Sequence, residues 1–180
     1  MAGPFLLAID GRSSSGKSTL AAQVVAAVPG AAVVHTDDIA WYHAVLDWDH
    51  LLREHVIAPL RDGRDVDYRP PGWAARERPG SVVVPASAPV VVIEGVGAGR
   101  ASLAALVDAV VWVETPLEET QARDAVRMAG GETTLENYEL WMAEELPFHE
   151  AERIWERADV VVDGTQPGGI DAVLALLPTA

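Results

Sequence analysis

The chain has 180 residues and no cysteine, so disulfide bonds, thiol catalysis and thiolate metal sites are excluded. Its 27 acidic residues outnumber 13 lysines and arginines, and the net charge of −14 argues against non-specific binding to nucleic acid or to an anionic membrane. The length predicts one domain, residues 1–180, with a substantial core. We expect a cytoplasmic protein, because no segment approaches a membrane span and the apolar run near the N-terminus is too short for a signal peptide.

The first expected strand, residues 5–9, leads directly into a glycine-rich motif. Residues 11–19 match G-x-x-x-x-G-K-[ST] at every fixed position, and the apolar spacing after them predicts a helix that Pro29 and Gly30 end. A strand, a glycine-rich turn and a helix bind phosphate through backbone N–H groups and the helix dipole. We expect a nucleotide triphosphate on Gly11, Ser13, Ser14, Ser15, Gly16, Lys17, Ser18 and Thr19, with Lys17 at the β/γ-phosphates and Ser18 on Mg²⁺.

Lys17 is the only lysine of the chain, whereas arginine occurs twelve times. A compact ammonium acts on phosphate as a point charge, which a planar guanidinium does not reproduce. A general bias toward arginine would explain the twelve arginines but not the place of the one lysine.

Two aspartates follow the second expected strand, residues 31–35. The carboxyl end of a parallel strand lies at the sheet edge where a phosphate-binding turn also opens. Phosphoryl transfer uses a carboxylate to accept or orient the proton of the attacking hydroxyl, and Asp37 and Asp38 are the candidates. The alternative is that one of them caps the next helix.

The middle of the chain contains two segments of different composition, residues 48–60 and residues 61–80. Apolar spacing predicts a helix over residues 48–60, where Asp47 and Asp49 are either caps or substrate contacts, with capping favoured. Residues 61–80 combine five of the twelve arginines with prolines and glycines, which predicts an ordered loop or small lid rather than a helix or central strand. This segment is either a solvated loop or a substrate-binding flap.

A short strand at residues 81–84 precedes a fully apolar strand, residues 90–93, that ends at Glu94. An acid at the end of a buried parallel strand is placed to bind Mg²⁺ or to orient the nucleophile. Gly95, Gly97 and Gly99 predict a flexible turn after it.

The last third of the chain predicts a short helix over residues 103–107, a buried strand over 109–113 and a helix in which Arg123 and Arg127 share one face. Thr134 would cap a long helix that includes Trp155, and Pro147 would bend or break this helix. A strand within residues 158–164 and a helix over residues 170–177 would follow. Five buried strands that alternate with helices predict an α/β fold: a parallel sheet covered on both faces, in a three-layer α/β/α arrangement. The strand order stays open.

In this layout the chain resembles the uridine kinase-like branch of P-loop small-molecule kinases, which includes phosphoribulokinase- and pantothenate kinase-type enzymes. The resemblance covers nearly the whole chain. Its marks are residues 9–12 leading into the phosphate loop, residues 36–38, 47–49, 66–68 and 92–95, Arg123-Asp124, and residues 158–160. Only the phosphate loop is specific by itself.

The resemblance implies a five-stranded parallel sheet and an ATP- and Mg²⁺-dependent kinase that transfers the γ-phosphoryl group to a hydroxyl of a small molecule. Asp37 matches the catalytic aspartate of the family, Glu94 the acid that ends the third strand, and Arg123 and Arg127 the arginines of a lid region at about residues 123–135. Lys17 would complete the catalytic set. We place the acceptor beside Asp38, Trp41, Asp49, Tyr68 and Arg76, with the flap at about residues 61–80.

Two alternatives remain open. An antibiotic-type phosphotransferase would use the same loop and aspartate with a different pocket, and a non-catalytic module would bind ATP without turnover. A GTPase is disfavoured, because its Asn-Lys-x-Asp motif needs a second lysine. The expected partners are ATP and a small-molecule acceptor, without nucleic acid or membrane, and a homodimer stays open.

Overall fold

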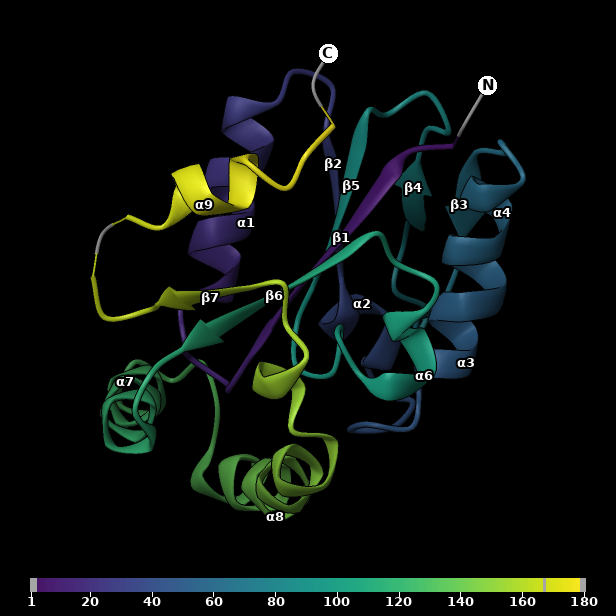
Figure 1. The fold of residues 1–180 in the computed structure, drawn as a ribbon. Coiled ribbons are helices and arrows are strands. Elements are labelled where there is room, and N and C mark those ends of the chain that lie inside the picture. Colours follow the sequence, from purple (N-terminus) through teal and green to yellow (C-terminus); the bar gives the residue numbers. More distant parts are fainter. Residues whose placement is uncertain (1–2, 167, 179–180) are drawn as a thin grey trace.

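The structure, a computed structural model, describes residues 3–166 and 168–178; residues 1–2, 167 and 179–180 of the expected domain lie outside the described residues. Its main strands are β1 (Phe5–Gly11), β2 (Ala32–His35), β5 (Val90–Glu94), β6 (Ala109–Glu114) and β7 (Val160–Asp163). They form one sheet in the order β2-β5-β1-β6-β7, and all four pairings are parallel (Figure 1). The predicted five-stranded parallel sheet is confirmed.

The sheet is central because its inner strands are apolar along their whole length. Every residue of β5 is buried, and so is all of β1 after Phe5. Strands that are buried on both faces need such continuous apolar runs, since alternation would put polar groups into one of the two cores. In the register of the sheet, His35 and Ile9 both pair with Glu94, so the ends of β1, β2 and β5 meet at one edge.

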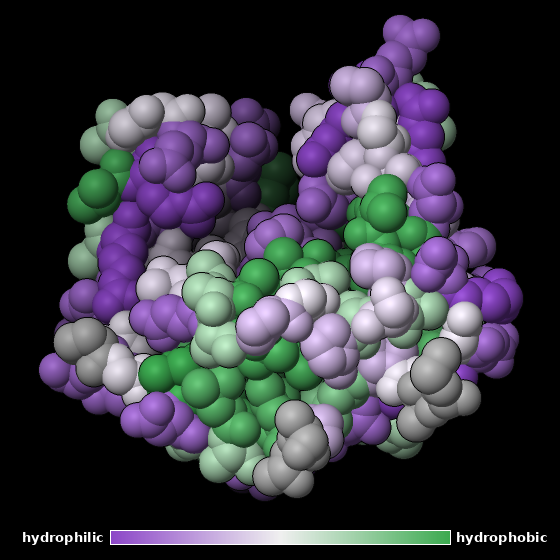
Figure 2. All heavy atoms as spheres, turned by 90° about the horizontal axis from the view of Figure 1, so that it is seen from above, coloured by the Kyte–Doolittle hydropathy of each residue, from purple (hydrophilic) through white to green (hydrophobic). Residues whose placement is uncertain are grey.

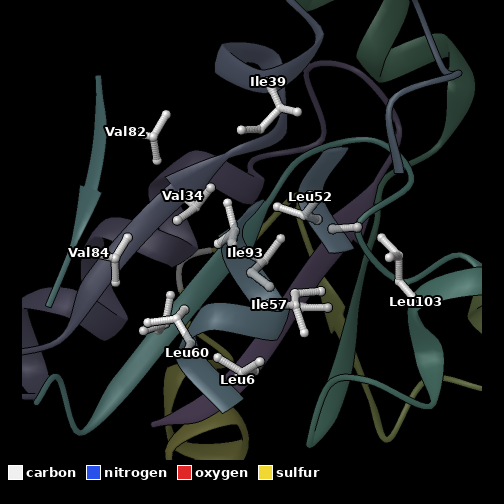
Figure 3. Packing of buried hydrophobic residues seen from close by; sticks show 14 of the residues in the cluster. Leu6, Val34, Ile39, Leu52, Ile57, Leu60, Val82, Val84, Ile93 and Leu103 are labelled. Atoms are coloured by element: carbon white, nitrogen blue, oxygen red, sulfur yellow. The ribbon is translucent and has the colours of Figure 1, made fainter. Parts of the chain in front are cut away.

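Helices cover both faces. They are α1 (Lys17–Ala27), α2 (Thr36–Ala40), α3 (Asp49–Leu52), α4 (Ala58–Arg61), α5 (Pro71–Ala75), α6 (Ala101–Ala104), α7 (Leu117–Ala129), α8 (Leu135–Glu152) and α9 (Ile170–Leu174). Leu20 and Val24 of α1 and Val173 of α9 pack in one core cluster. The other face carries the larger cluster, in which Leu52, Leu60 and Leu103 from α3, α4 and α6 meet Ile93 of β5 (Figure 3). The predicted three layers are confirmed.

The helix expected over residues 48–60 is present as one helical run from Asp49 to Arg61, with a π-helical stretch at Arg53–Ile57 between α3 and α4. The favoured capping role of Asp47 or Asp49 is wrong, because no side chain caps the start of α3. Asp49 instead accepts a hydrogen bond from Ser102 Oγ at 2.6 Å.

The segment 61–80 is more regular than its composition predicted. It contains β3 (Val66–Tyr68), which pairs antiparallel with β4 (Val82–Val84), and the short helix α5. The expectation that the segment contains no helix is therefore wrong, and the reason is burial: Val66 and Trp73 belong to the large core cluster. Two buried side chains anchor a segment whose prolines and arginines suggested a solvated loop.

Five further features differ from the sequence expectations. The turn at Gly95–Gly99, expected to be flexible, is buried along its length. The helix predicted at 103–107 lies at Ala101–Ala104, and the last helix ends at Leu174. Thr134 caps α8 as expected, but Pro147 does not break this helix, which continues to Glu152. Trp155 lies beyond it, in a 3-10 turn at Ile154–Glu156.

The start of β1 and the described residues after α9 lie on the same side of the molecule, above the sheet in Figure 1. Seen from that side, hydrophobic residues gather at the centre of the surface and hydrophilic residues surround them (Figure 2). Among the residues that the structure describes, no helix is both long and apolar enough to cross a membrane.

Candidate active site

The phosphate loop, Gly11–Ser18, folds as the motif requires. Its turn closes with a hydrogen bond from Ser15 N to Arg12 O at 3.1 Å, and Gly16 has a φ of 103°, a left-handed conformation that glycine adopts without strain. Lys17 then begins α1, so the helix N-terminus points at the turn. The Lys17 side chain is buried and donates from Nζ to Arg12 O at 2.6 Å.

Glu94 lies beside this loop, as the sequence predicted. Ser18 Oγ donates to Glu94 Oε1 at 3.1 Å, and His35 Nδ1 lies 2.6 Å from Glu94 Oε2. Sequence reasoning missed His35, although it is the last residue of β2 and its register partner is Glu94. The hydroxyl of Ser18 and the carboxylate of Glu94 thus place two hard oxygen atoms side by side at the N-terminus of α1.

The charges at this edge are coupled. Burial would raise the pKa of Glu94, but the hydrogen bond with His35 and the charge of Lys17 outweigh it and bring this pKa below its ordinary value. The bond with Glu94 raises the pKa of His35. Asp37 is exposed to solvent, but partial desolvation of its carboxyl raises the pKa of Asp37 against the opposing charge of Lys17.

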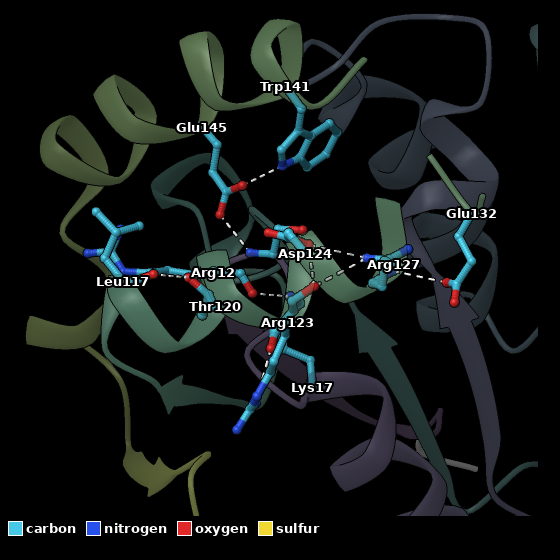
Figure 4. A network of polar contacts seen from close by, with 12 residues as sticks. Arg12, Lys17, Leu117, Thr120, Arg123, Asp124, Arg127, Glu132, Trp141 and Glu145 are labelled. Atoms are coloured by element: carbon cyan, nitrogen blue, oxygen red, sulfur yellow. Dashed lines mark hydrogen bonds and ion pairs between the residues drawn. The ribbon is translucent and has the colours of Figure 1, made fainter. Parts of the chain in front are cut away.

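The two arginines of α7 contact the loop. Arg123 donates to Ser14 O and to Gly164 O, both at 3.1 Å, and Arg127 donates to Ser14 Oγ at 3.3 Å (Figure 4). Asp124, between them in sequence, accepts from Ser14 Oγ at 2.5 Å. The helix α7 is therefore docked on the outer turn of the loop, with its arginines bonded to protein groups.

A cavity of about 790 Å³ opens beside the loop. Residues Ser13–Ser18 form one wall, and Asp37 and Glu94 lie at the end of the sheet. The aromatic part of the lining comprises Trp41 and Tyr42, which follow α2, and Tyr138 and Trp141 of α8. A second hollow of about 310 Å³ lies on the other side of the loop and includes Thr19, Arg123 and Arg127. Every residue of the predicted phosphate site except Gly11 lines one of the two cavities, and Gly11 ends β1 beneath the loop.

Of the five predicted acceptor residues, Trp41 lines the larger cavity. Arg76 lies behind its wall, with its guanidinium 4.0 Å from the ring centre of Tyr42. Asp38 is paired with Arg78 at 2.8 Å, Asp49 is bonded to Ser102, and Tyr68 stacks on His55 with ring centres 4.4 Å apart. The last three are not among the described residues that line the cavity.

The structure adds residues that no sequence motif marked. Asn137, Tyr138 and Trp141 reach the cavity from α8. Arg100 is buried and donates to Leu46 O at 2.6 Å and to Gly97 O at 3.0 Å, which ties the segment between α2 and α3 to the buried turn after β5. The only feature of the sequence that could have indicated this role of Arg100 is its position directly after a glycine-rich turn.

No family model matches the chain, and no curated protein matches it in sequence. Solved structures share its fold. A possible uridine kinase from Bacillus stearothermophilus superposes with a TM-score of 0.51 at 22% identity, over 91% of this chain and 90% of that one. A candidate fructose transport system kinase from Silicibacter sp. TM1040 superposes with a TM-score of 0.60 at 20% identity, over 89% and 90%.

This likeness extends over nearly the whole of each chain. The protein therefore shares the three-layer α/β/α fold of these two structures. The fold shared with the possible uridine kinase agrees with the fold that the resemblance in the sequence implied. At 20–22% identity, the activity and the acceptor have to be argued from the residues of this chain.

Proposed function

We propose that this protein is an ATP- and Mg²⁺-dependent kinase that transfers the γ-phosphoryl group to a hydroxyl of a small molecule. The observation that carries this proposal is the convergence of four groups on one cavity: Lys17 and Ser18 from the phosphate loop, Glu94 from β5 and Asp37 from the first turn of α2. Phosphoryl transfer needs little more than positioning and charge stabilisation, and these groups supply both.

The residues fit ATP and Mg²⁺. The left-handed turn at Gly16 aims backbone N–H groups and a helix N-terminus at the place where phosphates would bind. Ser18 Oγ and Glu94 Oε1, 3.1 Å apart, are the oxygen ligands that Mg²⁺ prefers, Glu94 directly or through water. When bound, ATP supplies the phosphoryl group and Mg²⁺ neutralises part of its charge.

Side chains of this protein would stabilise charge, position the acceptor and accept its proton. Lys17 places a positive charge at the mouth of the loop, and Arg123 and Arg127 hold the outer turn, where they are near enough to reach a phosphate in the smaller hollow. Asp37 orients the acceptor hydroxyl and takes its proton; its raised pKa makes it a better base than an ordinary aspartate. His35 holds Glu94 from the side opposite Ser18.

The charges of the cavity favour an acceptor that is uncharged or cationic. Among the described residues that line it, the lysine and arginine side chains are Lys17 and Arg127, and both lie at the phosphate loop. An acceptor carboxylate or phosphate at the aromatic end would face Asp37 and Glu94 without a cation of its own. Aromatic walls suit a flat or ring-shaped compound.

The arginines of residues 61–80 do not alter this preference for an uncharged or cationic acceptor. Arg78 is paired with Asp38 at 2.8 Å and lies 3.6 Å from the ring centre of Trp73, so its charge is already used. We propose that residues 61–80 act as a flap that supports the cavity wall at Trp41 and Tyr42, and that residues 123–135 act as the lid region, both within a single domain.

The test is acceptor-dependent ADP release over a panel of hydroxyl compounds, including nucleosides, sugars and aminoglycoside antibiotics, each paired with a phosphorylated or carboxylated analogue. We expect turnover with an uncharged or cationic member, and none with its anionic analogue. The Asp37→Ala variant should bind ATP and release no ADP. ATP binding without turnover for any acceptor would favour the non-catalytic module, and turnover with an antibiotic alone would identify the rival phosphotransferase.

A further inference from the structure

A buried carboxylate of α8 reaches the phosphate loop from 132 positions away in the sequence. Glu145 is only 1% exposed, and its Oε1 accepts a hydrogen bond from the backbone N–H of Ser13 at 2.7 Å (Figure 4). Its other oxygen, Oε2, accepts from the indole Nε1 of Trp141. His149 Nε2, one turn further along α8, lies 3.2 Å from Oε1.

The charge of this carboxylate is maintained in the folded protein. Burial would raise the pKa of Glu145, but the hydrogen bonds with His149 and Ser13 and the charges of His149 and Lys17 outweigh burial and lower it. Hydrogen bonds to a charged group are the stronger ones, and the loss of a partner in a buried network leaves the other groups unsatisfied.

The hydrogen-bond network around Glu145 is packed against the sheet through His149, and it contacts two parts of the cavity. His149 is 1% exposed and packs edge-on against Trp112 of β6, with ring centres 5.2 Å apart. At one end, Ser13 belongs to the phosphate loop; at the other, Trp141 belongs to the aromatic part of the cavity. One carboxylate thus joins the loop to a residue of α8 that lines the cavity.

We propose that Glu145 is a positioning residue that fixes the Ser13 peptide of the phosphate loop and links it, through the Trp141 indole, to the acceptor side of the cavity. This inference rests on the proposed function, because it assigns Glu145 a part in holding the ATP-binding loop. Glu145 does not touch the reacting atoms in this arrangement; it acts through Ser13.

A carboxylate is needed here because donors approach both of its oxygens. Ser13 N–H points at Oε1 and Trp141 Nε1–H points at Oε2. Glutamine has one acceptor oxygen and one NH₂ group, so in either orientation its NH₂ would face an N–H. The Glu145→Gln variant therefore sets one NH₂ group against one N–H donor. Trp141→Phe removes the indole N–H and should relieve this clash between donors.

The experiment is a double-mutant cycle with Glu145→Gln, Trp141→Phe and the double variant, with Glu144→Gln as the control because Glu144 is the exposed neighbour on the same helix. Calorimetry measures the Kd of Mg·ATP, and amide hydrogen exchange measures the protection of Ser13. We expect Glu145→Gln to weaken ATP binding and to speed exchange at Ser13 by about tenfold each, the size of one lost charge-assisted hydrogen bond. The double variant should lose less than the sum of the single variants.

Three results would overturn the proposal. Glu145→Gln could match Glu144→Gln in both measurements, which would leave Glu145 without influence on the loop. It could bind ATP more tightly than the wild type, which would make the carboxylate a competitor of phosphate. The losses could also add in the double variant, which would separate Trp141 from Ser13. A wild type that fails to bind ATP would refute the proposed function instead, while exchange at Ser13 would still decide the role of Glu145.

Discussion

Replacing Asp10 with asparagine should destabilise the protein by about 2–4 kcal/mol, since it removes one of the two acceptor oxygens that hold the turn after β5. Asp10 is fully buried near the end of β1. Its Oδ1 accepts from Gly11 N at 2.7 Å and Gly97 N at 3.0 Å, and its Oδ2 accepts from Gly99 N at 2.7 Å. An asparagine would keep one set of bonds and point its NH₂ at the remaining backbone N–H.

The magnitude follows from these three contacts. A hydrogen bond to a charged group contributes about 1.5–3 kcal/mol, and an unsatisfied buried donor costs about 1–3 kcal/mol. Burial raises the pKa of Asp10 despite its backbone hydrogen bonds, which means that the buried charge itself costs stability. Asparagine avoids that cost, so the net loss falls below the sum of the two effects.

The assay is equilibrium urea unfolding of the wild type and the Asp10→Asn variant at neutral pH. Asp62→Asn is the matched control, because its exposed pairing with Arg64 should contribute less than about 1 kcal/mol. A loss for Asp10→Asn that is no larger than that of the control would refute the reasoning, since it would mean that the turn does not depend on the carboxylate.

Three further expectations concern the site. Lys17→Arg should weaken Mg·ATP binding at least about tenfold in calorimetry, because a bulky planar fork replaces a compact charge in a buried position; unchanged affinity would contradict this. Gly72→Ala should lower the melting temperature more than Ala74→Ser does, since its Cβ would lie 1.8 Å from Trp41 O; equal melting temperatures would be the contrary result. The kcat/KM of the proposed kinase should fall on acidification with a midpoint above 3.8, because the raised pKa of Asp37 means that it takes up its proton at higher pH; a midpoint at or below 3.8 would exclude Asp37 as the base.

The sequence predicted the parts of this protein that local pattern determines. Short continuous apolar runs predicted the strands β1, β5 and β6, because strands that are buried on both faces have such runs. The spacing from Gly11 to Ser18 predicted the loop, because Gly16 takes the left-handed conformation of the turn and Lys17 bonds back to Arg12 within it. Glu94 could be placed next to the loop because parallel strands end at one edge of the sheet.

The parts that remained hidden depend on contacts between distant residues. No local pattern connects Glu145 with Ser13 or Arg100 with Leu46 O, and each contact exists only after the helices have packed. The arginines of residues 61–80 show the same limit. Their number left a solvated loop and a substrate-binding flap both open, and only the fold shows that Arg78 pairs with Asp38 and stacks on Trp73.

The measurement that tests the central claim most directly is ³¹P NMR of Mg·ATP incubated with the protein and an acceptor that supports ADP release. A kinase of the proposed kind converts the γ-phosphate signal into that of a phosphate monoester together with ADP, and Asp37→Ala leaves ATP unchanged while still binding it. Inorganic phosphate in place of the monoester, or full transfer by Asp37→Ala, would contradict the account.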